Sequence, residues 1–107
     1  MSENMREVNV EQFDEVLKGD KPVICDFFAT WCGPCRMLSP VMDELAAEYK
    51  DKAVFIKTDI DQNEELANRY KVYTIPRVKI FKNGAEIAEQ AGFVPKETMK
   101  DFLDENL

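Results

Sequence analysis

The chain has 107 residues, of which 45% are hydrophobic, enough for a single domain spanning residues 1–107 with one core. It carries 14 basic and 21 acidic side chains, a net charge of −7. This balance argues against binding to nucleic acid, which depends on Lys and Arg neutralising phosphates. No apolar run is long enough to cross a membrane, and the polar stretch Met1 to Glu7 lacks the apolar core of a signal peptide. We therefore expect a cytoplasmic protein that does not contact membranes.

The first half of the chain alternates between strand and helix patterns. Its longest strand pattern is apolar on both faces except at Cys25 and Asp26, which is typical of a central strand in a covered sheet. The expected elements are a short strand at Val8 and Val10, a helix over 11–18, a turn over 19–22, a strand over 23–29 and a helix over 34–49.

The second half continues the alternation and closes with a hairpin. We expect a strand over 53–57, a helix that Asn63 caps and that reaches Tyr70, strands over 78–81 and 86–88, and a last helix that Pro95 opens. Asn83-Gly84 between the two strands is a strong signal for a tight hairpin. The order βαβαβαββα predicts an α/β fold: a central mixed five-stranded sheet with helices on both faces and an antiparallel edge.

Two cysteines, Cys32 and Cys35, stand where the strand over 23–29 gives way to the next helix. Residues i and i+3 of a helix have Cβ atoms about 5–6 Å apart, and a disulfide needs Cα atoms roughly 4.4–6.8 Å apart. The pair can therefore form and break a disulfide with little backbone movement. Free N–H groups and the positive dipole at the helix start favour an anion, here the reactive thiolate of Cys32. The pattern indicates a redox-active dithiol.

Two other interpretations of the cysteine pair are weaker. A structural zinc ion needs four nitrogen or sulfur ligands, and the chain has no histidine and a single further cysteine, Cys25. We therefore expect no metal. A purely structural disulfide would close a short loop and remove little entropy from the unfolded chain.

The motifs around the cysteines resemble those of the thioredoxin family. The similarity covers nearly the whole chain, from the first helix to Leu107. The matching residues, in the family's order and spacing, are Asp26, Trp31-Cys32-Gly33-Pro34-Cys35, Lys57, Ile75-Pro76, Phe81-Lys82-Asn83-Gly84 and Gly92. The resemblance implies a thioredoxin fold and a general protein-disulfide reductase that works by thiol–disulfide exchange.

The resemblance also implies a role for each of five residues. Cys32 would be the attacking thiolate and Cys35 the resolving thiol, more buried in the helix. Asp26 would lie beneath the disulfide and help to deprotonate Cys35, and Lys57 would modulate Asp26. Pro76 would be cis, in a loop that faces the disulfide and aligns an incoming peptide. The strand pattern itself predicts a raised pKa for Asp26, because burial disfavours the charged carboxylate.

A flat, mostly apolar docking surface is implied as well, made by Trp31, Gly33, Pro34, Thr74, Ile75, Pro76, Ala91 and Gly92. The expected partners are client proteins with disulfides and a thioredoxin reductase that uses NADPH and flavin. The sequence shows no Gly-rich nucleotide fingerprint, so we expect these cofactors to belong to that partner and none to be bound by this chain. We expect a monomer.

Several positions depart from the common pattern of the family. Phe28 stands where many relatives have Trp, which keeps an aromatic ring but loses an indole donor. Tyr73 and Thr74 form an uncommon combination before Ile75, which bears on the preference for clients or for the reductase.

Arg77 and Cys25 are two further departures. Arg77 follows Pro76 where Thr is usual, and it shares one strand face with Lys79, so that face is either poorly covered or its charges are paired. Cys25 points to the opposite face from Asp26 and is predicted to be a small buried hydrophobe.

Two other functions on the same fold stay open from the sequence. A disulfide oxidase or isomerase differs mainly in the two residues between the cysteines and in compartment; Gly33-Pro34 and the polar N-terminus argue against it. A binding or chaperone-type module would use the fold as a surface, with an incidental disulfide.

Overall fold

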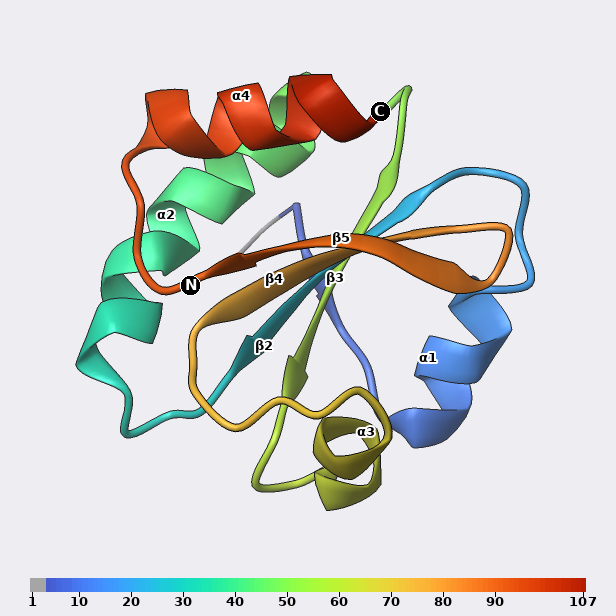
Figure 1. The fold of residues 1–107 in the computed structure, drawn as a ribbon, viewed down its shortest axis with the longest axis vertical. Coiled ribbons are helices and arrows are strands. Elements are labelled where there is room, and N and C mark those ends of the chain that lie inside the picture. The colour runs from blue at the N-terminus through green and yellow to red at the C-terminus, as the bar shows by residue number, and fades with distance from the viewer. Residues whose placement is uncertain (1–3) are drawn as a thin grey trace.

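A five-stranded sheet with helices on both faces makes up the described part of the chain, residues 4–107, in a computed structural model (Figure 1). The first three residues of the polar N-terminal stretch lie outside the described residues. The predicted order of elements is confirmed. The strands are β1 (Arg6–Glu7), β2 (Val23–Phe28), β3 (Val54–Asp59), β4 (Arg77–Lys82) and β5 (Ala85–Ala91), and the helices are α1 (Val10–Val16), α2 (Gly33–Glu48), α3 (Glu64–Arg69) and α4 (Lys96–Asn106).

The sheet has the strand order β1-β3-β2-β4-β5, with β2 at its centre. β3 pairs in parallel with β1 and β2, whereas β4 runs antiparallel to β2 and β5. Because β2 and β3 are parallel, the segments that follow them leave the sheet at the same edge. No helix within residues 4–107 is both long and apolar enough to cross a membrane.

Each face of the sheet has its own apolar core. Helices α2 and α4 cover one face, and α1 and α3 cover the other (Figure 1). The first core joins α2 and α4 to the sheet through Leu38, Met42, Leu45, Met99, Leu103, Ile24, Val78 and Ile80. The second centres on Phe13 of α1, whose ring lies 5.4 Å from that of Tyr70 and 5.4 Å from that of Phe81. Two closely packed layers of helices thus bury both faces of β2.

The opening strand is shorter and earlier than predicted. Asn9 and Gln12 form a reciprocal capping box, in which each backbone N–H donates to the other's side chain at 2.9 Å. This cap starts α1 at Val10, so the prediction that Val10 belongs to a strand is wrong. Val8 follows β1 and stays attached to the sheet, since its N–H donates to the Lys57 carbonyl at 2.9 Å.

Helix α3 begins after Asn63, as predicted, but the Asn63 side chain does not cap it. Its Nδ2 instead donates to the Asp59 carbonyl at 3.1 Å. The side chain therefore braces the turn that leads out of β3, and the predicted capping bond is wrong.

The hairpin between β4 and β5 has the predicted tight turn. Asn83 and Gly84 have φ angles of 53° and 81°, in the left-handed region that Asn and Gly adopt most readily. Two successive residues of this kind give a turn whose twist matches that of the flanking strands. The two strands then pair from Lys82 and Ala85 to Arg77 and Ala91.

Charged residues of β4 are paired with acidic residues of β5. Arg77 and Lys79 lie on the face covered by α1 and α3, and together with Glu86 and Glu89 they form what we call the β4–β5 charge network. Of the two outcomes expected for this face, the paired one is confirmed.

Cys25 should resist alkylation in the native oxidised protein. Its side chain is fully buried in the α1/α3 core, and burial, with a smaller contribution from the Asp26 carboxylate, raises the pKa of the thiol well above its ordinary value. Iodoacetamide followed by mass spectrometry is expected to add nothing to the native protein and one adduct after unfolding in urea. Rapid modification of the native protein would show that the strand opens readily.

Candidate functional site

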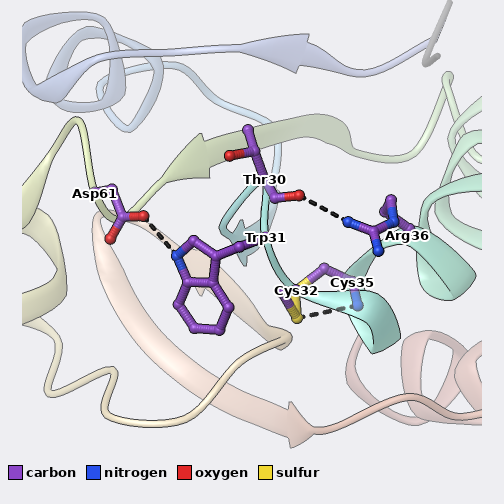
Figure 2. Close-up of a disulfide and its surroundings, with 6 residues drawn as sticks. All are labelled: Thr30, Trp31, Cys32, Cys35, Arg36 and Asp61. Atoms are coloured by element: carbon purple, nitrogen blue, oxygen red, sulfur yellow. Dashed lines mark hydrogen bonds between the residues drawn. A yellow bond between two sulfur atoms is a disulfide. The ribbon is translucent and has the colours of Figure 1, made fainter.

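The site lies at the connection between the end of β2 and the start of α2. Cys32 is the N-cap of α2, Pro34 falls in its first turn, and a disulfide joins Cys32 to Cys35 with their Cα atoms 5.2 Å apart (Figure 2). The Cys35 N–H donates to the Cys32 sulfur at 3.2 Å. Cys32 Sγ thus takes the place of the oxygen that usually caps a helix, in a position where backbone N–H groups favour a thiolate.

The two cysteines are almost equally buried, with exposed fractions of 4% for Cys32 and 5% for Cys35. The expectation that Cys35 is the more buried of the two is therefore wrong for the oxidised protein. The two cysteines form one small apolar cluster with Ala29, and Ile75 packs against this cluster. The disulfide is consequently shielded by neighbouring apolar side chains rather than by depth within α2.

Trp31 is held beside the disulfide by a residue that sequence reasoning missed. Its indole N–H donates to Asp61 Oδ2 at 2.7 Å, while 67% of the residue stays exposed (Figure 2). The two residues are 30 positions apart but follow β2 and β3, whose ends Phe28 and Asp59 lie opposite one another. No local motif marks Asp61; only the parallel pairing of the two strands reveals it.

Arg36 fastens the other end of the same segment. Its Nη1 donates to the Thr30 carbonyl at 2.9 Å (Figure 2). The Cys32 N–H donates to the Ala29 carbonyl at 3.2 Å. The backbone that carries the disulfide is thus fixed on both sides.

Asp26 is buried in β2, with an exposed fraction of 4%, opposite Lys57 of β3. Its Oδ1 finds no hydrogen-bond partner among residues 4–107. Burial raises the pKa of Asp26 to about 7, against the opposing influence of the Lys57 ammonium, which lowers it. Lys57 itself lies over the Phe28 ring, with Nζ 5.5 Å from the ring centre.

Asp26 and Cys35 share a pocket. The cavity has a volume of about 230 Å³, and its lining includes Asp26, Phe28, Cys35, Ser39 and Lys57. The lining includes two ionisable side chains, Asp26 and Lys57, and the cavity has room for water molecules. The structure therefore brings Lys57 of β3 to the same site as Asp26, Cys32 and Cys35, which belong to β2 and the start of α2.

The loop before β4 approaches the disulfide through Ile75, and the Ile75–Pro76 peptide bond is cis. The Gly92 N–H donates to the Pro76 carbonyl at 2.8 Å, which fixes the end of β5 against this loop. Gly92 has a φ of 78°, a conformation that favours glycine. Of the predicted docking residues, Trp31, Pro34, Thr74 and Ala91 are exposed, Gly33, Ile75 and Gly92 are half-buried, and Pro76 is buried.

A metal site has no support from the side chains of residues 4–107. Within this range no three His, Cys, Asp or Glu side chains gather closely enough to hold an ion. The chemistry that the arrangement can perform is the making and breaking of the Cys32–Cys35 bond.

Comparison with known proteins agrees with this chemistry. The sequence profile of the family Thioredoxin matches residues 4–105. The chain is 44% identical over 93 residues to "Thioredoxin 1" of Synechococcus elongatus, covering 87% of each protein. It is also 46% identical over 84 residues to "Thioredoxin" of Staphylococcus aureus, covering 78% of this chain and 81% of that one.

The fold, the disulfide at the start of α2 and these matches define a protein-disulfide oxidoreductase. The chain belongs to the thioredoxin family. With its cysteine pair at disulfide distance, it has the role of a disulfide reductase.

Asp26→Asn should make the protein more stable at neutral and alkaline pH. The folded pKa of Asp26, about 7, lies above the unfolded value of about 3.9, so the native state holds this proton more tightly. The stability that Asp26 contributes is complete below the unfolded pKa and falls as the pH rises from about 4 to about 7. Above that window the wild type has lost about 4 kcal/mol that the Asn variant does not lose.

Paired urea melts at pH about 4.5 and about 8 measure this difference. The two proteins should be close in stability at the lower pH and diverge at the higher one, with the variant more stable. An equal difference at both pH values would mean that the Asp26 carboxyl is solvated in the native protein.

Proposed function

We propose that this chain is a general protein-disulfide reductase in which Cys32 attacks and Cys35 resolves. The observation that carries this assignment is the position of Cys32 Sγ at the N-cap of α2, where it accepts a hydrogen bond from the Cys35 N–H. The helix terminus stabilises a negative charge on this sulfur and so favours the thiolate that exchange requires.

The reaction transfers two electrons in two exchanges. The Cys32 thiolate attacks one sulfur of a client disulfide, which forms a mixed disulfide and releases the other client sulfur as a thiolate that takes up a proton. Cys35, once deprotonated, attacks Cys32 Sγ; the Cys32–Cys35 disulfide forms and the second client thiolate leaves. The client is reduced to a dithiol and the dithiol of this chain is oxidised.

Asp26 is the proposed acceptor of the Cys35 proton. Its pKa of about 7 suits proton exchange near neutral pH, and it lines the same pocket as Cys35. Lys57, opposite Asp26, opposes the rise of this pKa and so tunes it. On this assignment Asp26→Asn should slow turnover, most clearly where deprotonation of Cys35 limits resolution, as a pH–rate profile of both proteins will show.

Clients and a thioredoxin reductase are proposed to dock on one surface around the disulfide. The surface comprises Trp31, Gly33, Pro34, Thr74, Ile75, Pro76, Ala91 and Gly92. Trp31 contributes an exposed ring that Asp61 anchors, and Tyr73, 79% exposed, directly precedes Thr74 in the chain. Exposed aromatic side chains near a reactive sulfur favour contact with another protein.

The reductase partner is proposed to supply the electrons from NADPH through its flavin, so that this chain needs no bound cofactor of its own. The lack of a Gly-rich nucleotide-binding fingerprint in this chain supports the assignment of both cofactors to the reductase. We also propose that the protein works in the cytoplasm as a monomer. The net charge of −7 supports solubility.

Reduction of insulin by dithiothreitol, with and without this protein, tests the proposal. Acceleration is expected, together with a low reduction potential for the Cys32–Cys35 couple. Acceleration with a strongly oxidising potential would instead indicate an oxidase or isomerase, and no acceleration would indicate a binding or chaperone-type module.

The Cys35→Ser variant should accumulate mixed disulfides with clients, because Cys32 can attack but nothing resolves the product. The Cys32→Ser variant is the matched control and should accumulate none. Non-reducing gels of each reduced variant incubated with insulin provide the measurement. Equal trapping by both variants would refute the assignment of roles.

A further inference from the structure

A row of polar contacts leads from the interior of the sheet to the docking surface. It starts at Lys79, whose side chain is only 4% exposed and whose Nζ lies 2.7 Å from Glu86 Oε2 and 2.9 Å from Glu89 Oε1. A buried ammonium is stable only when it is paired and hydrogen-bonded, so Lys79 holds both carboxylates in place.

Glu89 connects this buried charge to Arg77. The same Oε1 that accepts from Lys79 also accepts from Arg77 Nη1 at 3.2 Å. Hydrogen bonds from Lys79 and then Arg77 lower the pKa of Glu89 despite its partial burial, so it remains a carboxylate at neutral pH. Glu86, by contrast, forms its ion pair with Lys79, whereas Arg77 forms its ion pair with Glu89.

Arg77 links Glu89 to Thr74, a residue of the proposed docking surface. Its Nη2 donates to the Thr74 hydroxyl, directly before Ile75 and cis-Pro76. Its Nε is buried without a partner among residues 4–107, so the two contacts at the far end of the guanidinium decide its orientation. The planar guanidinium fixes the angle between its donors, and Thr74 is therefore placed by the position of Glu89.

The pairing of β4 with β5 does not depend on this connection. Backbone hydrogen bonds hold the hairpin in register, and the Gly92 N–H already fastens the Pro76 carbonyl. Lys79 would keep one carboxylate, Glu86, if Glu89 were removed. The Glu89–Arg77–Thr74 contacts are therefore additional to what the fold requires, and they end at a loop proposed to receive clients.

We infer that Glu89 and Arg77 are positioning residues for the client-binding loop: they hold Thr74 in the conformation in which residues 74–76 receive the backbone of a protein client. This inference rests on the proposed docking of clients at this loop. It assigns the network a part in recognition of polypeptide disulfides and none in the chemistry at Cys32 and Cys35.

The test compares Glu89→Val with Glu86→Val. Both changes remove one carboxylate partner of Lys79 and introduce a residue that suits a strand, but only the first releases Arg77. Each reduced variant is assayed with insulin at varied concentration and with the small disulfide 5,5′-dithiobis(2-nitrobenzoate), which is too small to need the loop.

For Glu89→Val, KM for insulin should rise about three- to tenfold, with kcat nearly unchanged. This is roughly the effect of losing the net contribution of one hydrogen bond to client binding. Its rate with the small disulfide and the Cys32–Cys35 potential should equal those of the wild type. Glu86→Val should match the wild type in all three. Arg77→Val should raise KM as Glu89→Val does, and the double variant should be no worse than Arg77→Val, since the two residues act in series.

Equal KM values for Glu89→Val and Glu86→Val would overturn the inference, as would additive effects in the double variant. A loss of activity toward the small disulfide in Glu89→Val would overturn it too, because that would place the residue in the chemistry or the stability of the site. If the wild type itself fails to reduce insulin while reacting with the small disulfide, the proposed function fails, which is a separate result.

Discussion

The parallel pairing of β2 with β3 is the constraint on which the site depends. It sets Asp26 opposite Lys57 and Phe28 opposite Asp59. The first pair puts an ionisable group in the interior, next to the Lys57 ammonium that opposes the effect of burial on its pKa. The second brings the segments after both strands to the same edge, where the start of α2 and the turn bearing Asp61 meet. The register between β2 and β3 thus determines both the position of Trp31 and Asp61 beside the disulfide and the surroundings of the buried Asp26 carboxyl.

The parts of this arrangement that could be predicted from sequence are those with a local cause. Asn83 and Gly84 readily adopt the left-handed conformation that the turn requires, so the hairpin could be predicted from these two residues. The central position of β2 was visible in its apolar faces. The Cys32–Cys35 bond was predictable because spacing along one helical turn fixes the separation of the two residues.

What sequence did not reveal depends on contacts between distant segments or on competition between local signals. Val10 has strand propensity, but the capping box at Asn9 outweighs it and begins a helix. The Asn63 side chain donates to the Asp59 carbonyl in the turn instead of accepting from the free N–H groups at the start of α3. Asp61 and Glu89 acquire their hydrogen-bond partners only when the strands align. The alternation along the strand placed Arg77 and Lys79 on one face, but it could not identify the carboxylates that pair with them.

The raised pKa of Asp26 has a consequence for how this protein can be observed. The sequence contains no histidine, the side chain that ordinarily titrates near neutral pH. Asp26, with a pKa of about 7, titrates in that interval instead. Isotope labelling of aspartate would therefore turn this interior residue into a built-in spectroscopic reporter, able to follow proton movement at the site while the disulfide opens and closes.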